Sequence, residues 1–252
     1  MSNLVQRFKA LLPKPALRAI QKLNARRFRA RHADLTTQEV FTQIYANGNW
    51  GKSSDPAQKF YSGAGSHDGT TLAAYVPAVQ SFLAELPNKP KVLDLGCGDF
   101  FVGSKIRHLC DSYVAADIVV PLIEFNREKF KALDVEFVVL DLITDALPPA
   151  DIVFVRQVFQ HLSNDQIGKA LKKIASQYRY LVLTEHLPST GAFVPNRDKP
   201  AGPETRTMLD SGVVLTQAPF NLKPVFEKTL CRATDADGEI VSIVYKLDTV
   251  PI

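Results

Sequence analysis

Residues 92–100 read Val-Leu-Asp-Leu-Gly-Cys-Gly-Asp-Phe, an apolar run that leads through an acidic residue into a glycine turn. Glycine at positions 96 and 98 lets the backbone approach a ligand closely, so a side chain at Gly98 is expected to occupy ligand space. Asp94 adds negative charge where a dinucleotide site would hold pyrophosphate, and therefore favours a cation. A dinucleotide fingerprint would also need glycine at position 101, where the chain has Phe101. Both observations disfavour a nicotinamide cofactor.

Short apolar runs alternate with amphipathic segments after Pro90, which predicts a parallel α/β sheet covered on both faces. The predicted strands are Lys91–Leu95, Tyr113–Asp117, Glu136–Asp141, Asp151–Val155 and Tyr180–Thr184. The predicted helices between them are Val102–Leu109, Pro121–Lys131 and Asp165–Gln177. Two further β-rich runs, Val225–Arg232 and Ile240–Leu247, flank a turn at Asp237 and Gly238 and predict an antiparallel hairpin.

The region before Pro90 has a different pattern. A helix is expected to begin at a cap on Thr36 or Thr37, and residues 47–69, rich in Gly, Ser and Asn, are expected to be irregular. Apolar residues then recur at helical spacing from Leu72 to Leu86. Residues 1–33 predict two short amphipathic helices broken by prolines 13 and 15.

Taken in order along the chain, these features resemble the class I methyltransferases that use S-adenosylmethionine, from about Phe41 to the C-terminus. Asp117 lies 19 residues after Gly98, where the family places an acid on the ribose hydroxyls. Asp141 and Leu142 match the position that contacts the adenine. The resemblance implies a Rossmann-like, doubly wound α/β fold. Its seven-stranded sheet would be mostly parallel, with an antiparallel C-terminal hairpin and an N-terminal helical extension.

Two other segments extend the resemblance. Residues 156–162, Arg-Gln-Val-Phe-Gln-His-Leu, look like the family's segment at the reacting end of the site. Trp50-Gly51 and residues 61–66 resemble a segment that folds over the cofactor in a subset of these enzymes. Phe100 departs from the pattern, since many members have a third glycine there. The residues that the resemblance assigns to the cofactor are Tyr61, Gly63, Gly65, Ser66, Asp94, Gly96, Cys97, Gly98, Asp117, Ile118, Asp141, Leu142 and Gln157.

Methyl transfer from a sulfonium requires alignment and exclusion of water more than acid/base catalysis. A hydroxyl acceptor must still lose its proton, and a histidine with a pKa near neutrality is a suitable base. His161 is the candidate base, with Gln157 or Glu185 orienting it or the acceptor; the alternative is a satisfied histidine at a helix start. His67 and His186 are expected in loops or at the rim. Three widely spaced cysteines fit no metal site, so no metal is predicted.

The charge of the chain is unevenly distributed. Among its 252 residues, positions 1–33 carry nine Lys or Arg and no acid, whereas the remainder carries 21 basic and 26 acidic residues, a net charge of −5. A basic amphipathic segment favours an anionic membrane surface. The chain has no apolar run near the roughly 20 residues that cross a bilayer, and no secretory signal. We therefore expect a cytoplasmic protein, peripheral on the inner membrane face; the alternative is that residues 1–33 form a solvated, oligomerisation or partner-docking arm.

The acceptor is expected to be a sugar hydroxyl in a surface polysaccharide or lipid-linked glycan. The main reason is the basic leader, which favours acceptors made at a membrane; in addition, residues 50–66 resemble methyltransferases found with surface-glycan assembly enzymes. A small metabolite, a protein side chain, or a non-catalytic module that binds S-adenosylmethionine are alternatives. A nucleic-acid substrate ranks lowest, since the body is acidic and lacks a base-amine motif. The expected units are a basic leader (1–33), a helical, cofactor-covering cap (34–90) and a core (91–252) with a substrate-binding insertion near 186–221.

Overall fold

A computed structural model describes residues 34–189, 192–235 and 238–248, with residues 20, 23, 24, 26–28, 30 and 32 of the N-terminal segment. The first helix expected within residues 1–33 and the turn residue Asp237 therefore lie outside the described residues; of the second helix, residues 20, 23, 24, 26–28 and 30 are described, and all of them are helical. Within the described part, no helix combines the length and apolarity needed to cross a membrane.

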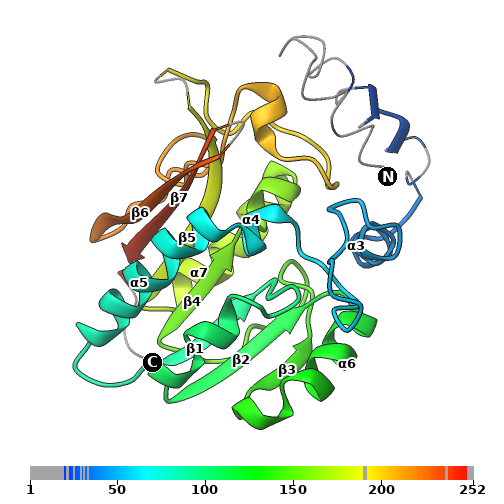
Figure 1. Cartoon of the computed structure of the whole chain (residues 1–252). Coiled ribbons are helices and arrows are strands. Elements are labelled where there is room, and N and C mark those ends of the chain that lie inside the picture. Colours follow the sequence, from blue (N-terminus) through cyan, green and yellow to red (C-terminus); the bar gives the residue numbers. More distant parts are fainter. Residues whose placement is uncertain are drawn as a thin grey trace.

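One seven-stranded sheet, in the order β3-β2-β1-β4-β5-β7-β6, forms the centre of the molecule (Figure 1). Its strands are β1 (Lys91–Leu95), β2 (Ser112–Asp117), β3 (Glu136–Val139), β4 (Ile152–Arg156), β5 (Tyr180–Pro188), β6 (Phe226–Asp235) and β7 (Gly238–Lys246). β1 to β5 pair in parallel, and β7 lies antiparallel between β5 and β6. The predicted doubly wound sheet and its C-terminal hairpin are confirmed.

Among β1 to β5, two strand ends differ from the prediction by two residues or more. β3 ends at Val139 because the following residues form a local turn, in which the backbone N–H of Ile143 donates to the Asp141 carboxylate at 2.8 Å. β5 continues four residues beyond Thr184, because β7 pairs with it as far as the Pro188–Gly238 partners. The longer β5 carries the residues after Thr184 to the edge of the sheet where parallel α/β folds bind ligands.

Five α-helices lie in the described part of the chain: α3 (Thr37–Ala46), α4 (Ala64–His67), α5 (Gly69–Ala84), α6 (Val120–Lys129) and α7 (Asn164–Gln177). α3 begins with a capping box in which Thr36 and Glu39 satisfy each other's backbone N–H groups. Ser163 and Gln166 do the same for α7. α4 is the one short helix within the otherwise irregular stretch predicted for residues 47–69.

The helix predicted over Val102–Leu109 is wrong. The segment forms two 3-10 turns, Gly103–Lys105 and Arg107–Leu109. Gly103 is a poor helix former, and it lies directly against the Phe100 ring, where a β-carbon would come within 2.3 Å. The Arg107 side chain donates to the carbonyl of Cys110 at 2.9 Å, which ends the second turn without an α-helical continuation.

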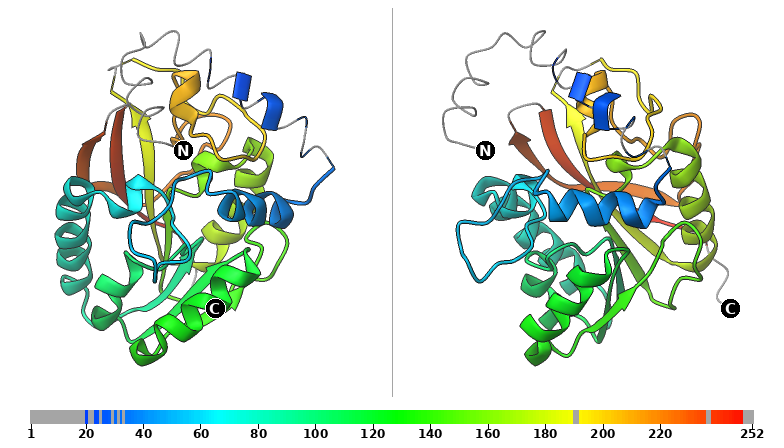
Figure 2. Two further views of the ribbon diagram at one scale, coloured as in Figure 1. Left: turned by 45° about the vertical axis from the view of Figure 1, so that its right-hand side comes forward. Right: turned by 90° about the vertical axis from the view of Figure 1, so that its right-hand side faces the viewer.

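Hydrophobic cores cover both faces of the sheet. Leu93 of β1 belongs to a core with α3 and α7, whereas its neighbour Val92 belongs to a core with α5. Figure 2 shows α5 and α7 on opposite sides of the strands. This alternation is what a buried parallel sheet requires, and it leaves the carboxyl ends of the strands free to form a site.

Residues 192–221 form an irregular insertion with one 3-10 turn, Arg206–Leu209. Arg206 is completely buried and donates from Nη2 to the carbonyl of Leu162 at 2.7 Å. Trp50 donates from its indole N–H to the carbonyl of Pro203 at 3.0 Å. These contacts fasten the insertion to the core and to the N-terminal cap beside the edge of the sheet.

Candidate functional site

A cavity of about 340 Å³ lies at the carboxyl edge of the sheet. The residues that line it follow the strand order, from Asp141 after β3 to His186 on β5 and Asp235 on β6. Ser62 to Ser66 also line it; they belong to residues 60–67, which precede the sheet in sequence and are called the upstream segment below. The volume is within the usual range for small-molecule sites.

Both glycines of the turn after β1 have left-handed backbone angles, with φ of 72° at Gly96 and 57° at Gly98. A β-carbon at Gly96 would lie 2.4 Å from the Val158 side chain, and one at Gly98 would lie 2.4 Å from Oγ of Ser62. The space beside Gly98 is therefore filled by the upstream segment, and the expectation that a side chain there would first meet the ligand is corrected. Glycine is needed because two protein segments meet at this turn.

Phe100 replaces the third glycine of the family pattern without opening the turn. It adopts a φ of 57° and is completely buried. Its ring packs edge-on against Tyr113 and Phe137, at centroid distances of 5.5 and 5.0 Å. Gly103 provides the room for this ring. The departure at Phe100 thus places an aromatic side chain in the core below the site.

The three acids that the resemblance assigns to the cofactor all line the cavity. Burial raises the pKa of Asp94 and of Asp117 to about 6 each. Asp94 accepts from the Tyr113 hydroxyl at 2.9 Å, and Asp117 accepts from the backbone N–H groups of Gly98 at 3.1 Å and Val119 at 3.0 Å. These contacts fix both carboxylates at the edge of the sheet, where hydroxyl and ammonium groups of a ligand can reach them.

The structure brings most of the other predicted cofactor residues to the same cavity. Those that line it are Gly63, Gly65, Ser66, Gly96, Cys97, Gly98, Ile118, Leu142 and Gln157. Tyr61 is not among the lining residues, since its ring stacks on His67 at a centroid distance of 4.6 Å. Gln157 adopts a φ of 56°, an uncommon angle for a side-chain-bearing residue, at the point where β4 turns over the site.

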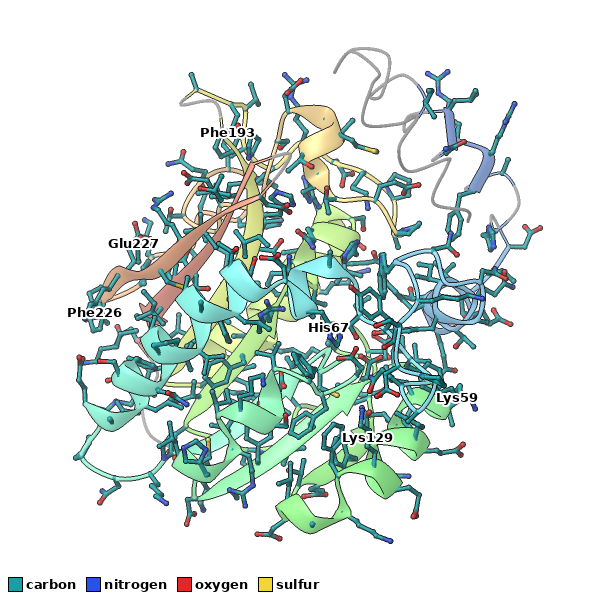
Figure 3. All side chains as sticks on the ribbon, viewed as in Figure 1. Lys59, His67, Lys129, Phe193, Phe226 and Glu227 are labelled. Carbon is teal, nitrogen blue, oxygen red and sulfur yellow. The ribbon has the colours of Figure 1, made fainter. Side chains whose placement is uncertain are left out.

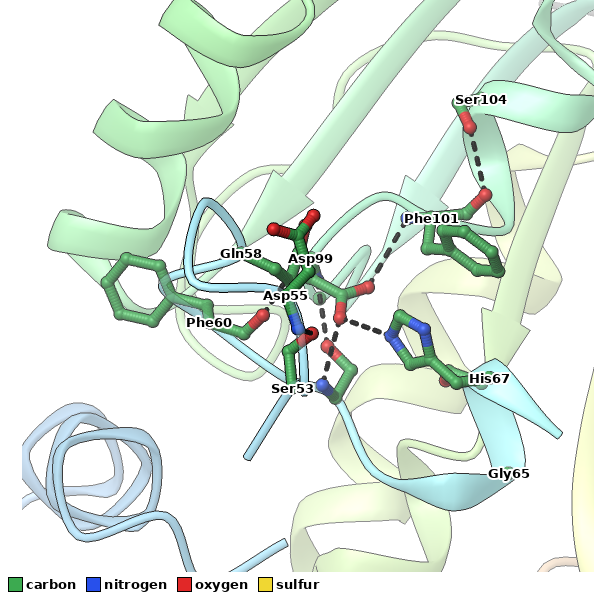
Figure 4. Close-up of polar contacts among 12 residues, drawn as sticks. Ser53, Asp55, Gln58, Phe60, Gly65, His67, Asp99, Phe101 and Ser104 are labelled. Atoms are coloured by element: carbon green, nitrogen blue, oxygen red, sulfur yellow. Dashed lines mark hydrogen bonds and ion pairs between the residues drawn. The ribbon is translucent and has the colours of Figure 1, made fainter. Parts of the chain in front are cut away.

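Asp99 holds the upstream segment in place, a role that the sequence did not indicate (Figure 4). It accepts from the backbone N–H of Ser62 at 3.0 Å and from Nε2 of His67 at 2.6 Å, and its own N–H donates to Oγ of Ser62 at 2.8 Å. The His67 ring is stacked between Tyr61 and Phe101. The His67 side chain is 18% exposed, and His67, labelled in Figure 3, does not line the cavity. No single short motif carries this signal, because the partners lie 37 and 32 residues apart.

His161 lines the cavity, and both of its ring nitrogens contact other groups of the protein. Nδ1 donates to the carbonyl of Gly202 at 3.2 Å, and Nε2 faces the Gln160 amide at 3.3 Å. Burial and the neighbouring Lys199 lower the pKa of His161 to about 3. The ring also packs 5.0 Å from that of Trp50. This geometry favours the satisfied, positioning histidine over the catalytic base.

Glu185 is buried on β5 and does not line the cavity. Burial raises the pKa of Glu185 to about 8, although Arg206 and nearby backbone N–H groups act in the opposite direction. With a pKa of about 8, the Glu185 carboxyl group is mostly protonated, and therefore neutral, at physiological pH. The next residue, His186, is the one that reaches the cavity, where its Nε2 lies 3.6 Å from the Asp235 carboxylate.

Comparisons with known proteins agree with the expected fold and with a methyltransferase domain. A family model described as a methyltransferase domain matches residues 92–179. No curated protein matches the sequence significantly.

Three solved structures share the fold. The N-methyltransferase NodS from Bradyrhizobium japonicum WM9, in complex with S-adenosylhomocysteine, is 13% identical, with a TM-score of 0.57 over 83% of this chain and 99% of that chain. Magnesium protoporphyrin IX methyltransferase from Synechocystis PCC 6803, with bound S-adenosylmethionine, is 14% identical, with a TM-score of 0.55 over 85% and 99%. The N-terminal domain of EvdMO1 with S-adenosylhomocysteine bound is 16% identical, with a TM-score of 0.50 over 71% and 85%.

At these low identities the solved structures show a shared fold, and the family model matches a methyltransferase domain over residues 92–179. The glycine turn, the acids at the ends of β1 and β2 and the cavity beside them are consistent with both. Residues 92–179 therefore match a methyltransferase domain, within a fold shared with methyltransferases that bind S-adenosylmethionine or S-adenosylhomocysteine.

Proposed function

We propose that the chain methylates a hydroxyl group of a sugar in a surface polysaccharide or a lipid-linked glycan. The observation that carries the proposal is the makeup of the cavity toward β5 and β6. The cavity lining includes the aromatic Trp50 together with the polar residues Thr37, His186, Thr205 and Asp235. An aromatic face with hydrogen-bonding groups around it matches a sugar, which has apolar C–H faces and a rim of hydroxyls.

The donor is proposed to lie at the β1–β3 end of the same cavity. Asp117 is placed to accept from the ribose hydroxyls, Asp141 and Leu142 to contact the adenine, and Asp94 to face the ammonium of the methionine end. When bound, S-adenosylmethionine supplies an electrophilic methyl group on a sulfonium. The segment at residues 60–67, which Asp99 holds down, excludes water from that end.

His186 is proposed as the group that receives the acceptor's proton. His161 has a pKa of about 3 and both nitrogens engaged, so it is a weak base at neutral pH. His186 lines the cavity, its backbone N–H donates to Oε1 of Gln160 at 3.2 Å, and the Asp235 carboxylate 3.6 Å from Nε2 stabilises a positive ring. As the oxygen bonds to the methyl carbon, the C–S bond breaks and the hydroxyl proton moves to the ring.

The basic leader is proposed to bring the enzyme to an anionic membrane, where lipid-linked acceptors are made. The described residues of the leader contact the side of the molecule on which the acceptor is proposed to bind. Phe28 lies against Gly202, and His32, stacked on Phe28 at 4.0 Å, bonds to the Gln43 side chain at 2.7 Å. A membrane-bound leader would therefore hold the insertion close to the surface on which the acceptor lies.

A screen with methyl-labelled S-adenosylmethionine tests this function. Glycan, lipid and soluble-metabolite fractions of cells are offered separately, and both S-adenosylhomocysteine release and the labelled product are measured. We expect label in the glycan or glycolipid fraction as an alkali-stable methyl ether, and about a 10²-fold lower rate with His186→Ala. Asp165→Ala, on the exposed face of α7, is the matched control. Label that appears in amines or in base-labile esters would contradict the proposal.

A further inference from the structure

Arg156 is the last residue of β4 and the only Lys or Arg among the described residues that line the cavity. Five aspartates line the same cavity, namely Asp94, Asp99, Asp117, Asp141 and Asp235. The surroundings therefore suit a ligand that is mainly cationic, with a single position suited to an anionic group. The side chain is partly exposed at this position.

The guanidinium of Arg156 is held by neutral acceptors. Nη1 donates to Oγ of Ser66 at 3.0 Å and to Oε1 of Gln157 at 3.1 Å, and Nη2 donates to the carbonyl of Gly65 at 2.6 Å. Its face lies 5.0 Å from the centre of the Tyr75 ring. These contacts set the direction of the planar group before any ligand binds, which reduces the entropy lost on binding.

The same guanidinium has no carboxylate of the described residues within 4.0 Å. Its Nε is buried and has no hydrogen-bond partner. Burial lowers the pKa of Arg156, and Asp94 and Asp99 compensate only from a longer distance. A cation that is desolvated in this way gains most from a carboxylate that binds through two nitrogens at once.

We propose that Arg156 binds the α-carboxylate of the methionine end of the donor. That end carries an ammonium and a carboxylate on one carbon, and the cavity offers Asp94 and Arg156, on the neighbouring strands β1 and β4, as partners of opposite sign. Because Arg156 also holds Gly65 and Ser66, the bound carboxylate stabilises the upstream segment over the donor. The inference rests on S-adenosylmethionine as cofactor and is independent of the acceptor.

Calorimetry with two ligands tests the proposal without any acceptor. S-adenosylhomocysteine is compared with its decarboxylated analogue, which keeps the adenosine, the thioether and the amine. The native protein should bind S-adenosylhomocysteine about 10- to 100-fold more tightly. Arg156→Gln should abolish this preference, and Arg156→Lys should restore part of it. Asp165→Ala, on the exposed face of α7 and away from the cavity, should keep the full preference.

Two results would overturn the proposal. Equal affinity of the native protein for both ligands would do so without reference to any variant, even if Arg156→Gln did not fold. An equal loss for both ligands in Arg156→Gln would show that Arg156 only holds the upstream segment. Failure of the glycan screen would leave these measurements unaffected, so the two proposals fail separately.

Discussion

His161 is neutral at physiological pH because burial opposes its protonated form. Its folded-state pKa of about 3 is below the ordinary value of about 6.5, so the unfolded chain takes up a proton between these values and the folded chain does not. The contribution of neutral His161 to the free energy of unfolding is therefore fully present above pH 6.5 and is lost as the pH falls toward 3. His161 therefore contributes to acid sensitivity more than to proton transfer.

Urea unfolding of the native protein and of His161→Gln at pH 7 and pH 5 measures this contribution. We expect the native protein to lose about 1–2 kcal/mol more than the variant over this interval, since each pH unit contributes at most about 1.4 kcal/mol. The other histidines are present in both proteins, so their effects cancel in the difference. Identical pH dependence in the two proteins would show that His161 is accessible to protons in the folded state.

At the scale of elements, the central feature is the contact between the turn after β1 and the segment at residues 60–67. Ser62 lies so close to Gly98 that a β-carbon there would come within 2.4 Å of Oγ. Asp99, the next residue, bonds to the same segment through Ser62 and His67. The glycine turn and its cover therefore depend on each other for position.

Gly98→Ala should lower both the melting temperature and the affinity for S-adenosylhomocysteine, the latter about tenfold or more. Two causes act together: the collision with Ser62, and the roughly 1–2 kcal/mol cost of a left-handed backbone for alanine. Adding Ser62→Gly removes the collision, so the double variant should be more stable than Gly98→Ala alone, even though Ser62→Gly by itself loses hydrogen bonds.

Gly168→Ala is the matched control, because nothing lies within 4 Å of a β-carbon at this position of α7. It should leave binding unchanged and raise stability by about 0.4–1 kcal/mol. If the loss of stability in the double variant equals the sum of the losses in Gly98→Ala and Ser62→Gly, the contact between residues 98 and 62 is not the reason that position 98 requires glycine.

The sequence was sufficient to predict elements whose stability comes from local pattern. The run Val92–Leu95, the N-terminal cap of α3 and the hairpin of β6 and β7 were predicted, because apolar periodicity and turn chemistry act over a few residues. Val102–Leu109 was mispredicted, since its apolar spacing is helical while Gly103 is required under the Phe100 ring. That requirement is tertiary and leaves no periodic signal.

At the scale of the whole molecule, the site joins segments that are distant in sequence. Most of the residues that the resemblance assigns to the cofactor line one cavity, because parallel strands end at the same edge. Asp99 with His67, and Arg156 with Gly65, were not identified, because each pair joins two segments through contacts that no local pattern encodes. His186 was undervalued because β5 was expected to end at Thr184.

The leader gives a prediction at the same scale. Replacement of Arg7, Lys9, Lys14 and Arg18 by serine removes four of its nine positive charges and keeps Phe28 and His32, which contact the folded body. The native chain should co-sediment with anionic vesicles at low salt and less so at physiological salt, where charges are screened over about 8 Å. The substituted chain should bind much more weakly. Equal binding by both chains, or none by the native chain, would contradict a membrane role for these charges.

Binding of S-adenosylhomocysteine to the native protein and to Asp117→Ala, measured by calorimetry, tests the cofactor site most directly. Asp117 ends β2 at the cavity and is the residue proposed to hold the ribose hydroxyls. Loss of its charge-assisted hydrogen bonds should cost roughly 1.5–3 kcal/mol, which weakens binding by about one to two orders of magnitude. Asp165→Ala should bind like the native protein. Unchanged affinity in a folded Asp117→Ala protein would contradict the site described at this edge of the sheet.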